Sequence, residues 1–183
     1  MRKISLFILK LFGWTRVLLP EEPEKFVLCV APHTSNWDFI FGLLFYNSVN
    51  YRFHIIMKKE WFVFPLNYFF KSIVVLPIDR KKRDLITNQM TEKFSSEKDF
   101  KLAITPEGTR SRNPKWKTGF YYIALNAGVP IVLGVIDYSK KEIGYKKIFY
   151  PTGDVKSDID EIKNFYNASQ AKYPKKFANN IDE

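Results

Sequence analysis

The sequence is poor in the residues that crosslink small secreted proteins or bind metals. It has one cysteine, Cys29, and two histidines among 183 residues. A single cysteine excludes an intrachain disulfide, and its place in the apolar run Phe-Val-Leu-Cys-Val indicates a buried thiol in a reducing compartment. No histidines and cysteines are clustered at the spacing of metal ligands. We therefore expect no metal site and no resident cofactor.

Long hydrophobic runs are also missing. A membrane-spanning helix needs about 20 predominantly apolar residues. Lys10 and Arg16 interrupt the N-terminal apolar stretch, and Pro65 interrupts an aromatic stretch at residues 61–70. We therefore expect no transmembrane helix.

Residues 2–19 have the spacing of an amphipathic helix. Their apolar side chains share one side of a helical projection, and the basic ones fall mostly on the other. This pattern is typical of a helix that lies in the headgroup region of a bilayer, but a helix packed against the protein's own core has it too. Both alternatives are open. The apolar residues are Ile4, Phe7, Ile8, Leu11, Phe12, Trp14, Leu18 and Leu19.

Acidic residues are in deficit: 19 Asp and Glu stand against 29 Lys and Arg, a formal net charge of +10. Such a balance predicts attraction to polyanions, among them nucleic acid, an anionic bilayer and phosphorylated substrates. Charge alone does not choose among them. The aromatic cluster at 61–70 adds a need for an apolar partner, inside or outside the protein.

The apolar pattern predicts a single α/β domain with a largely parallel sheet flanked by helices, because short apolar runs alternate with helical spacing. We expect an amphipathic helix at residues 1–19, a linker at 20–25, the domain at 26–173 and a polar tail at 174–183. The expected strands are 26–31, 51–57, 73–78, 101–105, 130–138 and 143–150, and the expected helices are 39–49, 85–94, 120–127 and 159–171.

His33 and Asp38 follow the first strand of this domain, where sites of parallel sheets gather. Five positions on a continuous helix turn through about 500°, so the two side chains meet only if His33 lies in the turn and Asp38 in the first helical turn. A histidine held by a carboxylate on one ring nitrogen can take a proton from a substrate hydroxyl on the other. Alternatively, Asp38 completes a capping box with Ser35, and it can do both.

A second polar segment, residues 101–112, runs from a strand into a turn rich in hydroxyl groups and arginines. Gly108 permits a tight turn, and Arg110 can bind a phosphate in a bidentate manner. Glu107 has an alternative role as a salt-bridge partner of Arg110 or Arg80, and Thr109 as a turn residue. Arg80 follows another strand end and is the best site candidate among the cations of residues 80–83, whose other members fit a solvated or lipid-facing patch.

In order and spacing, these residues resemble the glycerolipid acyltransferase family, whose best-known members are the lysophosphatidic acid acyltransferases. His33-Thr-Ser-Asn-Trp-Asp38 matches the family's His-x-x-x-x-Asp motif, and residues 107–111 match its Glu-Gly-Thr-Arg-Ser motif. Residues 78–80 resemble the end of the second motif and 129–132 the start of the fourth. Two departures bear on the acceptor: Val74 or a neighbour replaces a glycine of the second motif, and Leu133-Gly134 replaces the usual continuation of the fourth.

The resemblance implies that His33 is the general base and that Asp38 holds it. The acyl donor would be an acyl carrier protein or acyl-CoA thioester, and the acceptor the hydroxyl of a lysophospholipid such as 1-acylglycerol-3-phosphate. The implied substrate-binding residues are Lys58, Arg80, Glu107, Gly108, Thr109 and Arg110. The resemblance also implies a peripheral or monotopic protein on the cytoplasmic face of a membrane, the inner membrane of a bacterium, with an anionic lipid surface and no nucleic acid as partner.

Two other functions fit parts of the pattern. A thioesterase or esterase would use the same histidine with water in place of the alcohol, although no Gly-x-Ser-x-Gly elbow supports a serine hydrolase. A non-enzymatic basic module would bind a membrane or nucleic acid through charge and aromatics. Such a module leaves the ordered His33, Asp38 and Glu107 pattern unexplained.

Overall fold

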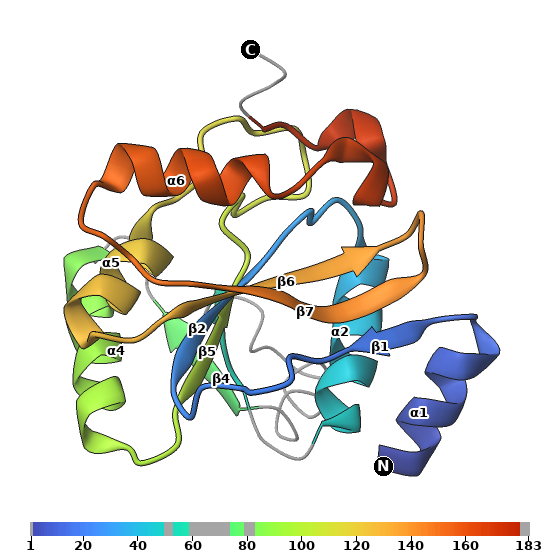
Figure 1. The fold of residues 1–183 in the computed structure, drawn as a ribbon, viewed down its shortest axis with the longest axis horizontal. Helices are drawn as coiled ribbons and strands as arrows, with labels where there is room; N and C mark the ends of the chain where they lie inside the picture. Colours follow the sequence, from blue (N-terminus) through green and yellow to red (C-terminus); the bar gives the residue numbers. More distant parts are fainter. Residues whose placement is uncertain (1, 50–52, 59–73, 79–82, 180–183) are drawn as a thin grey trace.

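The computed structural model describes residues 2–49, 53–58, 74–78 and 83–179, which form a sheet between two layers of helices (Figure 1). The strands are β1 (Thr15–Val17), β2 (Phe26–Val30), β3 (His54–Lys58), β4 (Val74–Ile78), β5 (Lys101–Ile104), β6 (Ile131–Asp137) and β7 (Glu142–Phe149). The helices are α1 (Arg2–Leu11), α2 (Asn36–Ser48), α4 (Arg83–Ser96), α5 (Gly119–Ala127) and α6 (Val155–Asn164), with short 3₁₀ turns η2 (Ala168–Gln170) and η3 (Pro174–Lys176).

The sheet has the strand order β1-β7-β6-β2-β5-β3-β4. All neighbouring pairs are parallel except β6 and β7, which form an antiparallel pair. The predicted α/β class with a largely parallel sheet is therefore confirmed. In this order β2 lies between β6 and β5, so the ends of these three strands are neighbours at one edge of the sheet.

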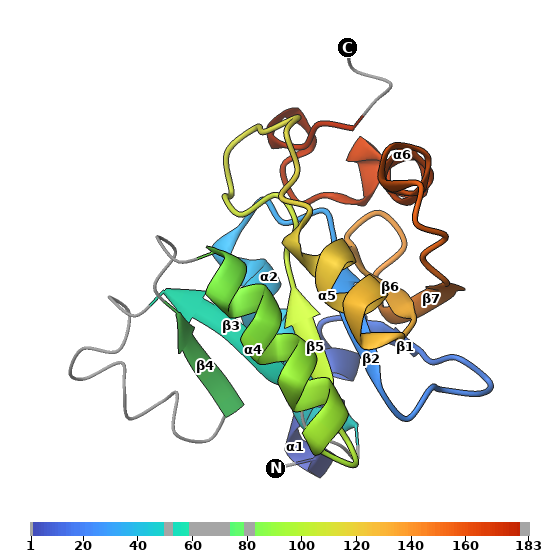
Figure 2. The same ribbon diagram turned by 90° about the vertical axis from the view of Figure 1, so that its left-hand side faces the viewer.

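Strand β2 is buried on both faces, as its continuous apolar sequence predicts. Phe26 and Leu28 pack into the core under α1 and α2, whereas Val27 and Cys29 face the core under α4, α5 and α6. Figure 2 shows α4 and α5 side by side on one side of the sheet. Burial raises the pKa of the Cys29 thiol, in keeping with a structural role.

The N-terminal helix is shorter than predicted: α1 ends at Leu11, and residues 15–17 are a strand, not helix. Gly13 has a positive φ of 77°, which ends the helical path, and the Thr15 N–H donates to the Lys141 carbonyl at 2.7 Å. Strand β1 then lies so close to β7 that a Cβ at Gly144 would be 1.9 Å from the Val17 carbonyl oxygen. Helical periodicity does not register this pairing, because the partner is about 130 residues away.

Helix α1 has an apolar face that the described residues leave exposed. The helix packs on α2 and the core through Leu9, which is 1% exposed. Ile4, Phe7 and Leu11 are 64%, 66% and 70% exposed. One side of α1 therefore packs on the protein while another presents large hydrophobic groups outward. None of the helices within the described ranges combines the length and the hydrophobicity that crossing a bilayer requires.

The C-terminal end also differs from prediction. Residues 174–179 are not a loose polar tail, since Phe177 and Ala178 are buried in or beside the core. The Asn179 side chain donates to the Tyr166 carbonyl at 2.9 Å. The last helix begins earlier than predicted, at Val155, because Asp154 caps it by accepting from the Ser157 N–H. It ends at Asn164, and η2 follows it.

Phe177 anchors this segment, and its truncation is the first test of the fold. The centre of its ring lies 6.3 Å from the centre of the Trp116 ring, and the residue is 2% exposed. Phe177→Ala should lower the free energy of unfolding by about 3 kcal/mol, because it leaves a cavity in the core. Urea denaturation followed by circular dichroism measures the change. Tyr150→Ala, at a residue 68% exposed, is the control and should change stability by less than about 0.5 kcal/mol; equal effects would contradict a core role for the segment.

Candidate active site

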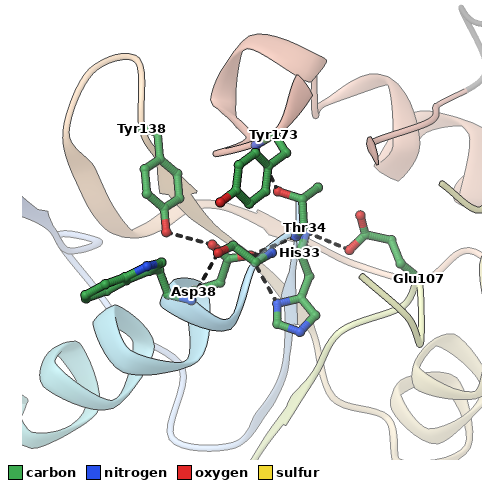
Figure 3. A network of polar contacts seen from close by, with 8 residues as sticks. His33, Thr34, Asp38, Glu107, Tyr138 and Tyr173 are labelled. Carbon is green, nitrogen blue, oxygen red and sulfur yellow. Dashed lines mark hydrogen bonds and ion pairs between the residues drawn. The ribbon is translucent and has the colours of Figure 1, made fainter. Parts of the chain in front are cut away.

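Three polar side chains from neighbouring strand ends meet at one edge of the sheet (Figure 3). His33 follows β2, Glu107 follows β5 and Tyr138 follows β6. Because β2 is flanked by the other two strands, His33 lies between Glu107 and Tyr138. The position agrees with the rule that sites of parallel sheets form at the carboxyl ends of strands.

Asp38 is the centre of the hydrogen bonds in this group. Its side chain is 2% exposed, and its Oδ2 atom accepts from the N–H groups of Thr34 and Ser35 at 2.7 and 2.8 Å. The Ser35 hydroxyl accepts from the Trp37 N–H, so Ser35 and Asp38 form a capping box at the start of α2. The other oxygen, Oδ1, accepts from the Tyr138 hydroxyl at 2.7 Å.

His33 is the side chain that faces the Asp38 carboxylate. Its Nδ1 lies 3.4 Å from Asp38 Oδ2, and its side chain is 16% exposed. The predicted meeting of the two residues is confirmed, and Asp38 serves both as helix cap and as partner of the histidine. Among the described residues no hydrogen bond or ion pair to Nε2 is found.

The hydrogen bonds keep Asp38 ionised despite its burial. Burial by itself would raise the pKa of this carboxyl, but the bonds from His33, Tyr138 and the Ser35 backbone outweigh it, and the pKa lies below its usual value. Tyr138 is affected in the opposite sense: burial and its bond to Asp38 raise the pKa of its hydroxyl. Tyr138 is therefore a neutral donor to a charged acceptor.

Glu107 supports His33 from the other side. Its Oε2 atom accepts from the His33 backbone N–H at 2.8 Å, and the residue is 4% exposed. Burial raises the pKa of Glu107 to about 8; the bond from His33 opposes the rise and the charge of Asp38 adds to it. The carboxyl group thus holds the backbone of the histidine. The predicted salt bridge from Glu107 to an arginine is not among the contacts found in the described residues, and its contact with substrate stays a prediction.

The turn after Glu107 is built around Gly108, which has a φ of 65°. A Cβ there would lie 2.7 Å from the end of the Lys117 side chain, so the lysine packs directly over the glycine. The Asn113 side chain donates to the Glu107 carbonyl at 2.9 Å and closes the loop. Thr109 is exposed and Arg110 is half-buried on this loop. Their roles as phosphate ligands stay predictions.

The other predicted site residues are placed only in part. Lys58 is the last residue of β3, at the same edge of the sheet as His33 and Glu107. Arg80 and the aromatic segment 61–70 lie outside the described residues. His54 is the first residue of β3 and thus lies at the opposite end of that strand, and its ring centre lies 4.3 Å from that of Phe100.

Sequence reasoning missed two contributors. Tyr138 is the last residue of an expected strand. The rule that sites of parallel sheets gather at the carboxyl ends of strands, which selects His33, applies equally to Tyr138. The second is the segment after η2: the Tyr173 N–H donates to the Thr34 hydroxyl at 3.3 Å, and the Lys172 ammonium lies 4.7 Å from the centre of the Trp37 ring. No signal in the sequence marked this segment, because its partners are more than 130 residues away.

Comparisons with known proteins concern the family and the fold of this chain. A family model described as "Acyltransferase" matches residues 18–136, which is more than half of the 183-residue chain. No curated protein matches the sequence. A solved structure with a similar fold is the 1-acyl-sn-glycerophosphate (LPA) acyltransferase PlsC from Thermotoga maritima, with a TM-score of 0.59 and 16% identity over 90% of this chain and 74% of that chain. At this identity the likeness concerns the fold. By its sequence match, which contains His33, Asp38 and Glu107, the chain belongs to the acyltransferase family.

Proposed function

We propose that this protein transfers a fatty acyl group from an acyl thioester to the hydroxyl of a lysophospholipid such as 1-acylglycerol-3-phosphate. The observation that carries the proposal is His33, whose Nδ1 faces the buried Asp38 carboxylate at 3.4 Å, which leaves Nε2 as the nitrogen that would face a substrate. Membership of the acyltransferase family supports it. So does the fold shared with a protein described as an LPA acyltransferase.

In this reaction His33 is the general base. Nε2 takes the proton of the acceptor hydroxyl as its oxygen attacks the thioester carbonyl carbon, and the tetrahedral intermediate expels the thiolate, which receives the proton back from Nε2. Asp38 stabilises the imidazolium that forms between these steps. Its depressed pKa keeps it anionic at the pH where the base must be neutral. Help of this kind is typically worth about 10²–10⁴ in rate.

The acceptor phosphate would bind at the loop after β5. The turn at Gly108 exposes Thr109 and places Arg110 two residues further, where a guanidinium can bind two phosphate oxygens at once. Lys58 ends the neighbouring strand β3, and Arg80 comes two positions after the end of β4 in the sequence. The binding of phosphate by these residues belongs to the proposal.

The acyl donor would be an acyl carrier protein or acyl-CoA thioester. Both are anionic, and the net charge of +10 favours either. The Lys172 ammonium lies within 5.9 Å of the centre of the Tyr138 ring, which places a cation close to the His33 and Asp38 pair. No resident cofactor takes part in this scheme.

Contact with an anionic membrane surface would come from α1. Its outward face carries Ile4, Phe7 and Leu11, which neither the sheet nor α2 covers. A helix with one face on the protein and another apolar face exposed can bury that face in the headgroup region while the domain stays in water. We propose a peripheral or monotopic location on the cytoplasmic face of a membrane.

His33→Ala should reduce acyl transfer at least 100-fold, because the general base is lost. Purified protein is offered acyl-CoA and acyl carrier protein thioesters with a panel of lysophospholipids, and products are identified by mass spectrometry. His54→Gln, at the only other histidine, is the control and should retain turnover. A His33-dependent diacyl product supports the proposal; free fatty acid alone would indicate a thioesterase, and no turnover with any donor would contradict an enzyme of this class.

Arg110→Ala should raise the KM for lysophosphatidate about tenfold or more with a smaller change in kcat, because a bidentate contact to phosphate is lost. Initial rates over a range of acceptor concentrations measure the effect. Monoacylglycerol, which has no phosphate, is the matched control acceptor, and its KM should change little in the variant. If the KM rises equally for both acceptors, Arg110 does not bind the phosphate.

Phe7→Ser combined with Leu11→Ser should weaken binding to anionic phospholipid vesicles about tenfold or more, because two large apolar side chains leave the lipid. Cosedimentation with vesicles gives the dissociation constant. The melting temperature should change little, since both residues are exposed. Tyr150→Ser alters an exposed aromatic on another part of the protein and should bind like wild type. Unchanged vesicle affinity in the double variant would refute the role of α1.

A further inference from the structure

Within the part of the chain that the structure describes, the Tyr138 hydroxyl is the group that hydrogen-bonds the second oxygen of the Asp38 carboxylate. Its hydroxyl donates to Oδ1 at 2.7 Å, across 100 positions of sequence. Oδ2 accepts from two backbone N–H groups and faces His33. The bonds to Oδ2 fix one atom of the carboxylate, and the bond to Oδ1 fixes its rotation about the bond to Cβ.

The direction of the Tyr138 hydroxyl is itself determined by its surroundings. The backbone N–H donates to the Gln170 carbonyl at 2.9 Å, next to η2. The ring packs edge-on against Trp14 at 5.1 Å and Phe41 at 6.2 Å between centroids. The Lys172 ammonium lies 5.9 Å from its ring centre. Contacts from the α1–β1 connection, α2 and the C-terminal segment therefore aim the hydroxyl at Asp38, as Figure 3 shows.

We propose that Tyr138 is a positioning residue of the acyl transfer: by donating to Oδ1 it holds the plane of the Asp38 carboxylate so that Oδ2 faces Nδ1 of His33. The neutral imidazole then carries its proton on Nδ1 and leaves Nε2 free as the base. Tyr138 acts through Asp38 and His33 and does not itself touch the reacting atoms. The inference rests on the proposed role of His33.

Tyr138→Phe tests this, because it removes the hydroxyl and keeps the ring that packs on Trp14 and Phe41. The chain offers a matched control in Tyr121, whose hydroxyl donates to Asp158 Oδ2 at 2.6 Å near the start of α6. Tyr121→Phe breaks a bond of the same kind away from His33. Any general loss of stability should appear in both variants, and thermal denaturation measures it.

Nitrogen NMR of the imidazoles reads the position of the proton directly. The protein has two histidines, so His33→Ala assigns the spectrum. At a pH where His33 is neutral, we expect Nδ1–H in wild type and in Tyr121→Phe, and a rise of the Nε2–H tautomer in Tyr138→Phe. In the acyl-transfer assay, kcat of Tyr138→Phe should fall about 10- to 100-fold with KM changed less than about twofold.

The outcomes separate the two proposals. A tautomer change confined to Tyr138→Phe supports the positioning role, whether or not a productive donor has been found. Unchanged His33 nitrogens in Tyr138→Phe overturn it, as does an unchanged kcat in an active enzyme. Absence of turnover in wild type counts against the proposed function only, because the NMR comparison still decides what Tyr138 does to His33.

Discussion

The buried carboxylate of Asp38 is the constraint on which the rest of the site depends. A carboxylate removed from water needs hydrogen-bond donors to stay charged. Here two consecutive backbone N–H groups, a tyrosine hydroxyl and a histidine supply them. These same bonds start α2 and shape the turn that carries His33. One interaction therefore serves both folding and the proposed chemistry.

The two carboxyl groups beside His33 have pKa values that are shifted in opposite directions. Asp38 has a lowered pKa because donors surround it, whereas burial raises the pKa of Glu107 to about 8. Near neutral pH Glu107 is mostly protonated, and its carbonyl oxygen can still accept the His33 N–H. Of these two carboxyl groups, Asp38 is therefore the one that holds its negative charge beside the imidazole most firmly. Such separation of two acids by their surroundings is a recurrent property of active sites.

The N-terminal segment links the surface of the protein to this site. Leu9 ties α1 to the core, and Trp14, just after the helix, packs on both Phe41 and Tyr138. Trp14 therefore connects the segment that follows α1 to the tyrosine that contacts Asp38. Under the proposed function, this contact connects the part of the chain proposed to bind lipid with the site proposed for acyl transfer.

Local sequence determined much of this protein. Continuous apolar runs identified β2, β5 and β6, helical spacing identified α2, α4 and α5, and the capping pattern Ser35-x-x-Asp38 set the turn that brings His33 to its partner. These features depend on neighbours a few positions apart. The order β6-β2-β5, the pairing of β1 with β7, the burial of Phe177 and the approach of Tyr138 and Glu107 were decided by tertiary structure. They join residues about 60 or more positions apart, and no local propensity or periodicity encodes which distant partner the folded sheet places beside them.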